Sequence, residues 1–248
     1  MKKGLLEGQA AVIAGASQGI GEEIARLFAS EGAEVVLLAR NGATLSRVAE
    51  DIQASGGKAR AYPMDVAVSE NWSKLADWMK AEGLVCRALV NNAYWRTLVP
   101  IGEVTDEDWD RTIGVSLKAY FLGSRAMIPL MLQAGGGSIV NISSMQSHTP
   151  EPSFGAYAVA KGGVDVLSKV IARDHGPLIR ANTIVSGAVD TPGFAEGDEV
   201  KLELGRRLPL QRIGFAMEIA NVALFLASSQ SSFVTGTEII ADGGRSIT

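Results

Sequence analysis

The segment that decides the fold is Ala10-Ala11-Val12-Ile13-Ala14-Gly15-Ala16-Ser17-Gln18-Gly19-Ile20-Gly21, where an apolar run leads into three glycines. Five apolar residues have the length of a short buried strand. The apolar positions that follow, Ile20, Ile24, Leu27 and Phe28, lie on one face of a helix. A strand, a glycine-rich turn and a helix in this order predict the first part of a βαβ unit.

The same alternation continues to the end of the chain. Further strands are expected at residues 35–39, 59–63, 85–91, 138–142, 180–185 and 238–241, with amphipathic helices between them. One long helix is expected from about 106 to 133, and residues 190–212 are polar and irregular. Strands that alternate with helices predict an α/β fold: a doubly wound, mostly parallel sheet with helices on both faces. We expect a single domain over residues 1–248.

The composition narrows the classes of function. The chain has 248 residues, 47% of them hydrophobic and 20% charged, as in a globular protein. A net charge of −4 and the lack of a long basic run argue against nucleic-acid and membrane partners. One cysteine and two separated histidines form no metal-binding motif, so no metal is expected. Met1–Gly4 is not followed by the apolar part of a secretory signal, so a cytoplasmic location is expected.

The glycine turn predicts a binding site for a dinucleotide. Gly15, Gly19 and Gly21 follow the first strand and open the first helix, and glycine lets phosphates approach the main chain without a Cβ clash. The start of the helix offers free N–H groups and the positive end of its dipole to a pyrophosphate. A purely structural turn, which also favours glycine, is the alternative.

The end of the second strand favours NADP(H) over NAD(H). This strand ends in Leu38-Ala39-Arg40-Asn41, without the carboxylate that would bond a ribose 2′-hydroxyl and repel a 2′-phosphate. Arg40 can pair with that phosphate through charge-assisted hydrogen bonds. The alternative is an ordinary solvated arginine, and Gln18 brings no second positive charge to the glycine turn.

Three further residues predict proton transfer to a carbonyl oxygen. Tyr157 and Lys161 are four residues apart on an expected helix, which brings them to one face with Cβ atoms about 5–6 Å apart. A nearby ammonium lowers the pKa of a phenol, so the phenol becomes a usable acid and base near neutral pH. Ser144 precedes the tyrosine by thirteen residues and can hydrogen-bond the same substrate oxygen.

This set of motifs resembles the short-chain dehydrogenase/reductase family, especially members similar to 3-oxoacyl-carrier-protein reductase. The resemblance covers nearly the whole chain and includes the glycine turn, Asn91-Asn92-Ala93, Ser144 and Tyr157 through Lys161. It implies a Rossmann-like sheet of seven strands, a homotetramer and a substrate lid at about residues 190–212.

The resemblance also implies roles for individual residues. Lys161 and Tyr157 would contact the cofactor, with Lys161 on the nicotinamide ribose. The other expected cofactor-binding residues are Gly15, Ser17, Gln18, Gly19, Ile20, Gly21, Arg40, Asp65, Val66, Asn91, Ala93, Gly187, Val189 and Thr191. The expected substrate residues are Tyr94, Trp95, Met145, His148, Phe154 and Phe194, a partly apolar set.

Two departures from the family pattern concern the site. The family usually has glycine at the position of Tyr94, and asparagine at the position of Ser116, where it completes a catalytic tetrad that holds a water. We expect Ser116 to take part in catalysis with an altered or water-filled relay.

The sequence thus predicts an oxidoreductase that moves a hydride between NADP(H) and a carbonyl or secondary alcohol substrate, with Ser144, Tyr157 and Lys161 in the catalytic group. Two alternatives stay open. One is an NAD-linked alcohol dehydrogenase on the same fold, and the other is a non-catalytic protein that uses an NADP site for regulation or assembly.

Overall fold

The computed structural model describes residues 4–194 and 197–248, which form a seven-stranded parallel sheet. The strands lie in the order β3-β2-β1-β4-β5-β6-β9, so the direction of winding reverses between β1 and β4. The predicted sheet of seven strands is confirmed. Its strands are β1 (Ala10–Ala14), β2 (Glu34–Ala39), β3 (Lys58–Pro63), β4 (Cys86–Asn91), β5 (Gly137–Ser144), β6 (Ile179–Ser186) and β9 (Glu238–Ala241).

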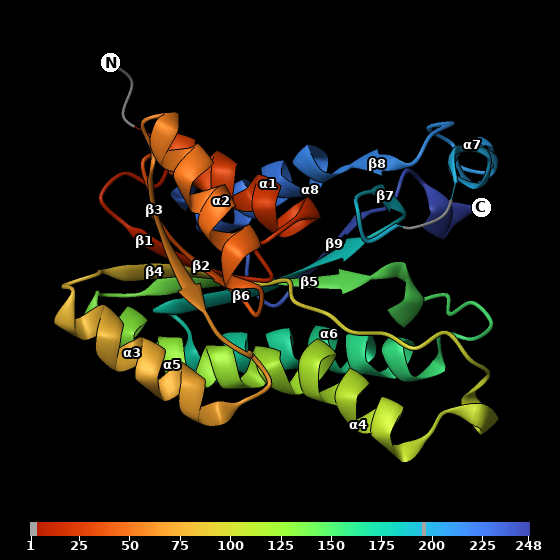
Figure 1. Ribbon diagram of the computed structural model, residues 1–248, viewed down its shortest axis with the longest axis horizontal. Helices are drawn as coiled ribbons and strands as arrows, with labels where there is room; N and C mark the ends of the chain where they lie inside the picture. The colour runs from red at the N-terminus through yellow and green to blue at the C-terminus, as the bar shows by residue number, and fades with distance from the viewer. Residues whose placement is uncertain (1–3, 195–196) are drawn as a thin grey trace.

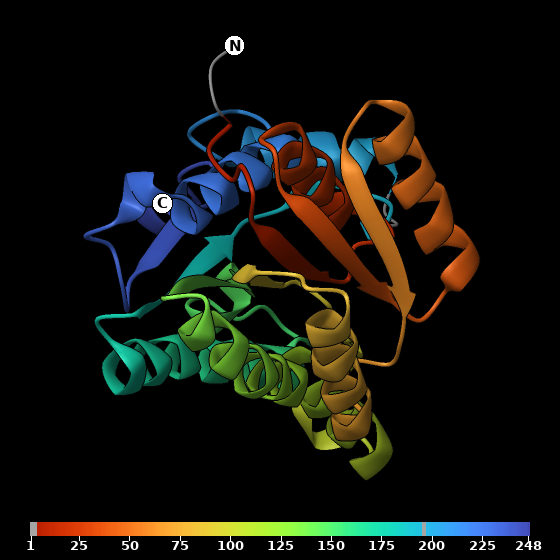
Figure 2. The same cartoon turned by 90° about the vertical axis from the view of Figure 1, so that its left-hand side faces the viewer.

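Helices cover both faces of the sheet (Figures 1 and 2). One layer contains α1 (Gly19–Ser30), α2 (Gly42–Ala54) and α8 (Ala216–Ala227). The other contains α3 (Ser69–Ala81), α4 (Asp106–Ile113), α5 (Ala119–Gln133) and α6 (Gly155–His175). Beyond the end of β5 lie α7 (Asp198–Arg206) and a short pair formed by β7 (Val189–Asp190) and β8 (Gly214–Phe215).

The alternation of side chains along β1 divides the core in two. Ile13 packs into the cluster that also holds Ile24 and Phe28 of α1, whereas Val12 joins the cluster on the opposite face with Trp72 of α3. Successive side chains of a strand point to opposite faces, so a central strand covered on both sides is apolar at every position. This accounts for the unbroken apolar run that precedes the glycine turn.

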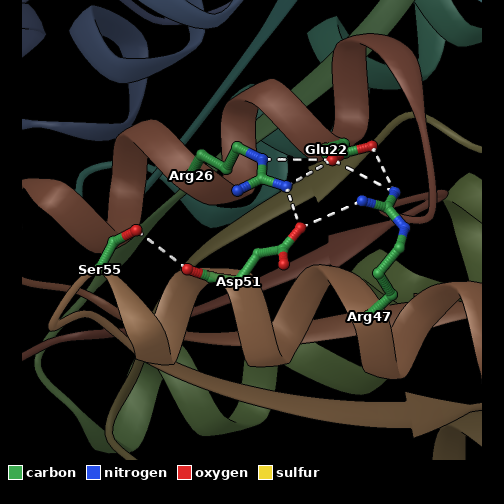
Figure 3. Close-up of polar contacts among 5 residues, drawn as sticks. All are labelled: Glu22, Arg26, Arg47, Asp51 and Ser55. Carbon is green, nitrogen blue, oxygen red and sulfur yellow. Dashed lines mark hydrogen bonds and ion pairs between the residues drawn. The ribbon is translucent and has the colours of Figure 1, made fainter.

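An ion-pair network joins α1 to α2 beside the glycine turn (Figure 3). Arg26 contacts Glu22 at 2.7 Å and Asp51 at 2.8 Å, while Arg47 reaches Asp51 at 3.1 Å and Glu22 at 3.3 Å. Two arginines therefore neutralise Glu22, the acid in the first turn of α1. This pairing offsets a negative charge that would otherwise repel an anionic ligand at the start of α1.

Two regions differ from the sequence-based expectation. The long helix expected over 106–133 is interrupted by a π-helical turn, Gly114–Lys118, between α4 and α5. The apolar periodicity continues through this turn and conceals the break. Residues 190–212 are not wholly irregular, because they include α7, a helix with a single buried residue, Gly205. Within the described ranges, no helix combines the length and apolar character needed to cross a membrane.

Candidate active site

The glycine turn has a conformation that other residues do not readily adopt. Gly15 and Gly19 have φ values of 78° and 60°, in the left-handed region. A Cβ on Gly21 would lie 2.0 Å from the carbonyl oxygen of Gly15, and one on Gly15 would lie 2.8 Å from the backbone nitrogen of Ala93. The turn is thus packed against the end of β4, and glycine is required there for steric reasons.

The residues around this turn fit a dinucleotide pyrophosphate. Gln18, the N-cap of α1, makes no side-chain hydrogen bond to the helix, which leaves the first amides available to a ligand. The turn borders a cleft of about 320 Å³ at the reversal point of the sheet, where ligands of doubly wound folds bind. The predicted cofactor residues that line it are Gly15, Ser17, Gln18, Gly19, Ile20, Arg40, Asp65, Val66, Ala93 and Thr191.

Arg40 and Asp65 occupy the far end of the cleft. Arg40 is exposed and makes no ion pair with any residue in the described ranges. Asp65 accepts a hydrogen bond from the backbone N–H of Ala67 at 2.9 Å, which fixes the turn that follows β3. The side-chain oxygen of Asn41 is already used, because it accepts a hydrogen bond from the N–H of Thr44 and caps α2. Among these residues Arg40 alone presents a positive charge to a ligand.

A second cavity, of about 500 Å³, continues from the cleft and contains Ser144, Tyr157 and Lys161. Ser144 ends β5, and Tyr157 and Lys161 lie one turn apart on α6. Both α6 residues are buried, so their polar atoms face the cavity and the sheet instead of bulk solvent. The cavity shares Tyr94 and Thr191 with the cleft, which makes the two spaces one continuous site.

Burial dominates the electrostatics of this group. Desolvation raises the pKa of Tyr157 well above its ordinary value, although Arg96 and Ser144 act to lower it. Desolvation also lowers the pKa of Lys161 to about 7, and Asp165 opposes this change. Burial therefore outweighs the neighbouring cations in setting the Tyr157 pKa, although the ammonium nitrogen of Lys161 lies 5.5 Å from the Tyr157 ring centre.

Comparison with known proteins identifies the family to which this chain belongs. A sequence model of the family described as enoyl-(acyl carrier protein) reductase matches residues 15–246. The chain belongs to the short-chain dehydrogenase/reductase family. It is thus an oxidoreductase of a family that binds a nicotinamide cofactor and includes both alcohol dehydrogenases and reductases.

Known relatives of this short-chain dehydrogenase/reductase match nearly its entire length. A cyclopentanol dehydrogenase from a Comamonas strain is 35% identical over 97% of this chain and 98% of its own. A 3-oxoacyl-[acyl-carrier-protein] reductase from Thermotoga maritima is 34% identical over 96% of this chain and 98% of its own. The crystal structure of a gluconate 5-dehydrogenase from Burkholderia cenocepacia, in complex with NADP and tartrate, superposes with a TM-score of 0.92 at 31% identity, covering 98% and 97% of the two chains.

The remaining predicted cofactor residues divide into three groups. Gly187 and Val189 line the second cavity beside Tyr157. Gly21 does not line either space, and its contribution is the close packing of the turn. Asn91 is buried, and its side-chain amide donates to the side chain of Asn141 at 2.8 Å, so its side chain is not available to a cofactor. The neighbouring Asn92, which the sequence reasoning missed, lines both spaces.

Ser116, which was expected in the catalytic group, lines neither the cleft nor the second cavity. It is fully buried in the π-helical turn, and its hydroxyl donates to the carbonyl of Trp95 at 2.7 Å and accepts from the N–H of Trp95 at 2.9 Å. The hydroxyl thus uses its donor and one of its two acceptor positions to hold the segment after β4. The polar group that reaches Lys161 from this side is the hydroxyl of Tyr120, four residues further along, at 2.8 Å.

The expected substrate residues are only partly brought together. Tyr94, Met145, Phe154 and Phe194 line the second cavity. Trp95 does not, because its ring lies against the guanidinium of Arg111, with 3.5 Å between that group and the ring centre.

His148 also lies outside the second cavity, and its Nε2 contacts Glu238 at 2.7 Å. His148, Asp165 and Glu238 place possible ligand atoms within 4.8 Å of one another, a grouping that sequence spacing could not reveal. Lys169 contacts Glu238 at 2.6 Å, so this cluster already forms an ion-pair network.

Proposed function

We propose that the protein is an NADP(H)-dependent oxidoreductase that interconverts a carbonyl compound and a secondary alcohol, with Tyr157 as general acid and base. The observation that carries this proposal is the convergence of Ser144, Tyr157 and Lys161 on one cavity, which opens into the cleft beside the glycine turn. A cofactor in the cleft would extend toward the cavity that holds the proton donor.

Each residue of the group has a distinct task in this proposal. The Ser144 hydroxyl hydrogen-bonds the substrate oxygen and orients the carbonyl at the end of β5. The Tyr157 hydroxyl gives its proton to that oxygen during reduction and takes it back during oxidation. The buried ammonium of Lys161 stabilises the phenolate that remains after proton transfer. The cofactor, when bound, supplies or accepts the hydride at the carbonyl carbon.

The preference for NADP(H) rests on Arg40. Its exposed guanidinium lies at the end of β2, where a ribose 2′-phosphate would approach, and the cleft residues in the described ranges provide no carboxylate next to it other than Asp65, which is engaged with Ala67. An arginine forms charge-assisted hydrogen bonds with a phosphate. Two alternative hypotheses are an NAD-linked dehydrogenase on this fold and a non-catalytic NADP-binding protein.

The test is a set of initial rates with a panel of ketones, keto esters, β-ketoacyl thioesters and secondary alcohols, each with NADPH or NADH and their oxidised forms. We expect turnover with a clear preference for the phosphorylated cofactor. Turnover with a preference for NAD(H) would support the rival dehydrogenase. Tight NADPH binding without turnover on any member of the panel would support the non-catalytic protein. Sedimentation of the same sample tests the homotetramer, which stays a prediction from the family resemblance.

A further inference from the structure

The second cavity contains one arginine for which the described residues provide no acidic partner. Arg96 lines the cavity and makes neither an ion pair nor a side-chain hydrogen bond with residues of the described ranges. The other arginine in the lining, Arg245, contacts Glu151 at 2.6 Å and is neutralised by it. Glu151 is the only carboxylate among the described lining residues, so this part of the lining carries an excess of positive charge.

Aromatic rings hold Arg96 close to Tyr157. Its guanidinium carbon lies 5.8 Å from the ring centre of Tyr94 and 5.5 Å from that of Phe154. The two rings are themselves 6.1 Å and 6.4 Å from the ring of Tyr157. Contacts with ring faces stabilise the cation but leave its N–H donors unused. Those donors are therefore available within the cavity that holds the proton donor.

We propose that Arg96 binds a carboxylate of the substrate, so that the substrate is an oxo acid or a hydroxy acid with an apolar body. This inference rests on the proposed function. The planar guanidinium matches a carboxylate with two parallel hydrogen bonds. Phe194, Val200 and Leu204 supply the apolar part of the lining. Arg40 lies in the cleft and not in this cavity, so the two arginines serve different anions.

The experiment compares oxo acids with their methyl esters. The probes are 4-oxopentanoate, 5-oxohexanoate and 6-oxoheptanoate, each beside its ester, with NADPH as the reductant. The variants are Arg96→Met, which keeps the length of the side chain, and Arg111→Met as the control, since Arg111 stacks on Trp95 outside the cavity. We expect the wild type to prefer an acid over its ester at least tenfold in kcat/KM. Arg96→Met should abolish this preference, whereas Arg111→Met should keep it.

Calorimetry separates this inference from the proposed function. Binding of the oxo acids to the enzyme with NADP⁺ is measured for the same three proteins, without any need for turnover. Binding that depends on Arg96, but without turnover, would overturn the proposed reaction and keep the anionic ligand. Turnover or binding that Arg96→Met leaves unchanged would overturn the carboxylate site, whatever the reaction is.

A second, independent observation concerns the environment of Lys161. Its ammonium donates to the hydroxyl of Tyr120 at 2.8 Å and to the carbonyl of Ile142 at 2.7 Å. Tyr120 is buried and donates its own proton to the same carbonyl at 3.1 Å. An ammonium can only donate, so the Tyr120 oxygen must accept and its proton must point to Ile142. The directions of all three hydrogen bonds are therefore fixed.

We propose that Tyr120 is a positioning residue, which holds the charged form of Lys161 beside Tyr157. The titratable groups that face Lys161 are Tyr120 from α5 and Tyr157 and Asp165 from α6. The π-helical turn before α5 sets the helix so that Ser116 meets Trp95 and Tyr120 meets Lys161.

Tyr120→Phe tests this role because it keeps the ring and removes only the hydroxyl. Tyr62→Phe is the control, since that ring packs on Trp78 far from the cavity. The Lys161 titration is followed by NMR of lysine labelled with ¹³C at Cε and assigned with Lys161→Met. We expect the Lys161 pKa to fall by about one unit in Tyr120→Phe, because the charged form loses an acceptor. If this variant does not fold, 3-fluorotyrosine at position 120 keeps the hydroxyl and weakens it as an acceptor.

The pH profile of alcohol oxidation gives a second readout that simple loss of packing would not move. A less charged Lys161 supports the Tyr157 phenolate less, so the rise of kcat with pH should shift upward by about one unit while KM stays within twofold. An unchanged Lys161 titration would overturn the positioning role even if the rate falls. An absent reaction would count against the proposed function alone, since the NMR titration decides this inference without turnover.

Discussion

The cleft and the second cavity adjoin each other, but the main chain shapes one and side chains shape the other. In the cleft, the main chain determines the shape of the site. Gly15, Gly19 and Gly21 bring a turn against Ala93 and leave the first amides of the helix without partners. In the cavity, side chains determine the shape and chemistry of the site. Arg96, Phe154 and Tyr157 come from two separate segments and meet only in the folded protein. A main-chain site follows from local spacing, whereas a side-chain site depends on tertiary packing.

The largest effect should come from removing the proton donor of the cavity. Tyr157→Phe is expected to lower kcat by roughly 10²–10⁴-fold, the usual contribution of a general acid. The affinity for NADPH should stay within about twofold, because the cleft is shaped by main chain. Stopped-flow rates and fluorescence titration measure the two quantities. Tyr62→Phe, whose ring packs on Trp78 and lines neither the cleft nor the second cavity, is the control; a Tyr157→Phe enzyme with wild-type kcat would exclude the assigned donor.

Adding one methyl group inside the glycine turn, behind the cleft, should have the next largest effect. In Gly21→Ala the new Cβ would overlap the carbonyl of Gly15, which lies 2.0 Å away. We expect a loss of about 1–3 kcal/mol of folding stability, as in other overpacked sites, and about tenfold weaker NADPH binding. Thermal unfolding and titration measure both. Gly102→Ala should change neither, since nothing lies within 4 Å of a Cβ there. Equal behaviour of the two variants would mean that the turn is not a steric requirement.

Discrimination between the cofactors should depend on a side chain even within the cleft. Arg40→Ala is expected to weaken NADPH binding by about tenfold, because the loss of a charge-assisted hydrogen bond at an exposed site costs about 1.5 kcal/mol, the low end of the usual range. NADH binding should change by less than about twofold, since it has no 2′-phosphate to lose. Dissociation constants for both cofactors give the answer. A similar loss for NADPH and NADH would remove the phosphate role of Arg40.

A separate prediction concerns how the free energy of unfolding depends on pH. The folded state lowers the pKa of Lys161 to about 7, so between pH 7 and about 10 the unfolded chain binds more protons than the folded one. This lysine therefore makes the wild type more stable as the pH rises through that range. Lys161→Met should be more stable than the wild type at pH 7, and the gap should narrow toward pH 10.

Urea unfolding at several pH values measures this gap for Lys161→Met. Lys169→Met is the control, because Lys169 lies at the surface and contacts Glu238. A gap that is constant with pH would indicate that Lys161 keeps an ordinary pKa in the folded protein.

The sequence by itself determined the fold, the glycine turn and the trio of Ser144, Tyr157 and Lys161. These features are local: strand and helix periods, glycine spacing and a four-residue interval on one helix. The carboxyl ends of parallel strands meet at one edge of a sheet, which explains why residues after β1 and β5 could be expected in a common site.

The tertiary structure alone decided which neighbours these residues have. Ser116 was expected in the catalytic group, but one π-helical turn directs its hydroxyl to Trp95 and brings Tyr120 to Lys161. Nothing in the sequence marked Arg96 as a binding residue. Its role as a free cation follows from the structure, because Glu151, the one acid among the described lining residues, is paired with Arg245. The apolar periodicity of a helix does not reveal a single extra residue in one of its turns. The amino-acid composition does not reveal which charged side chains form ion pairs. Such pairings depend on distances between segments that are far apart in the chain.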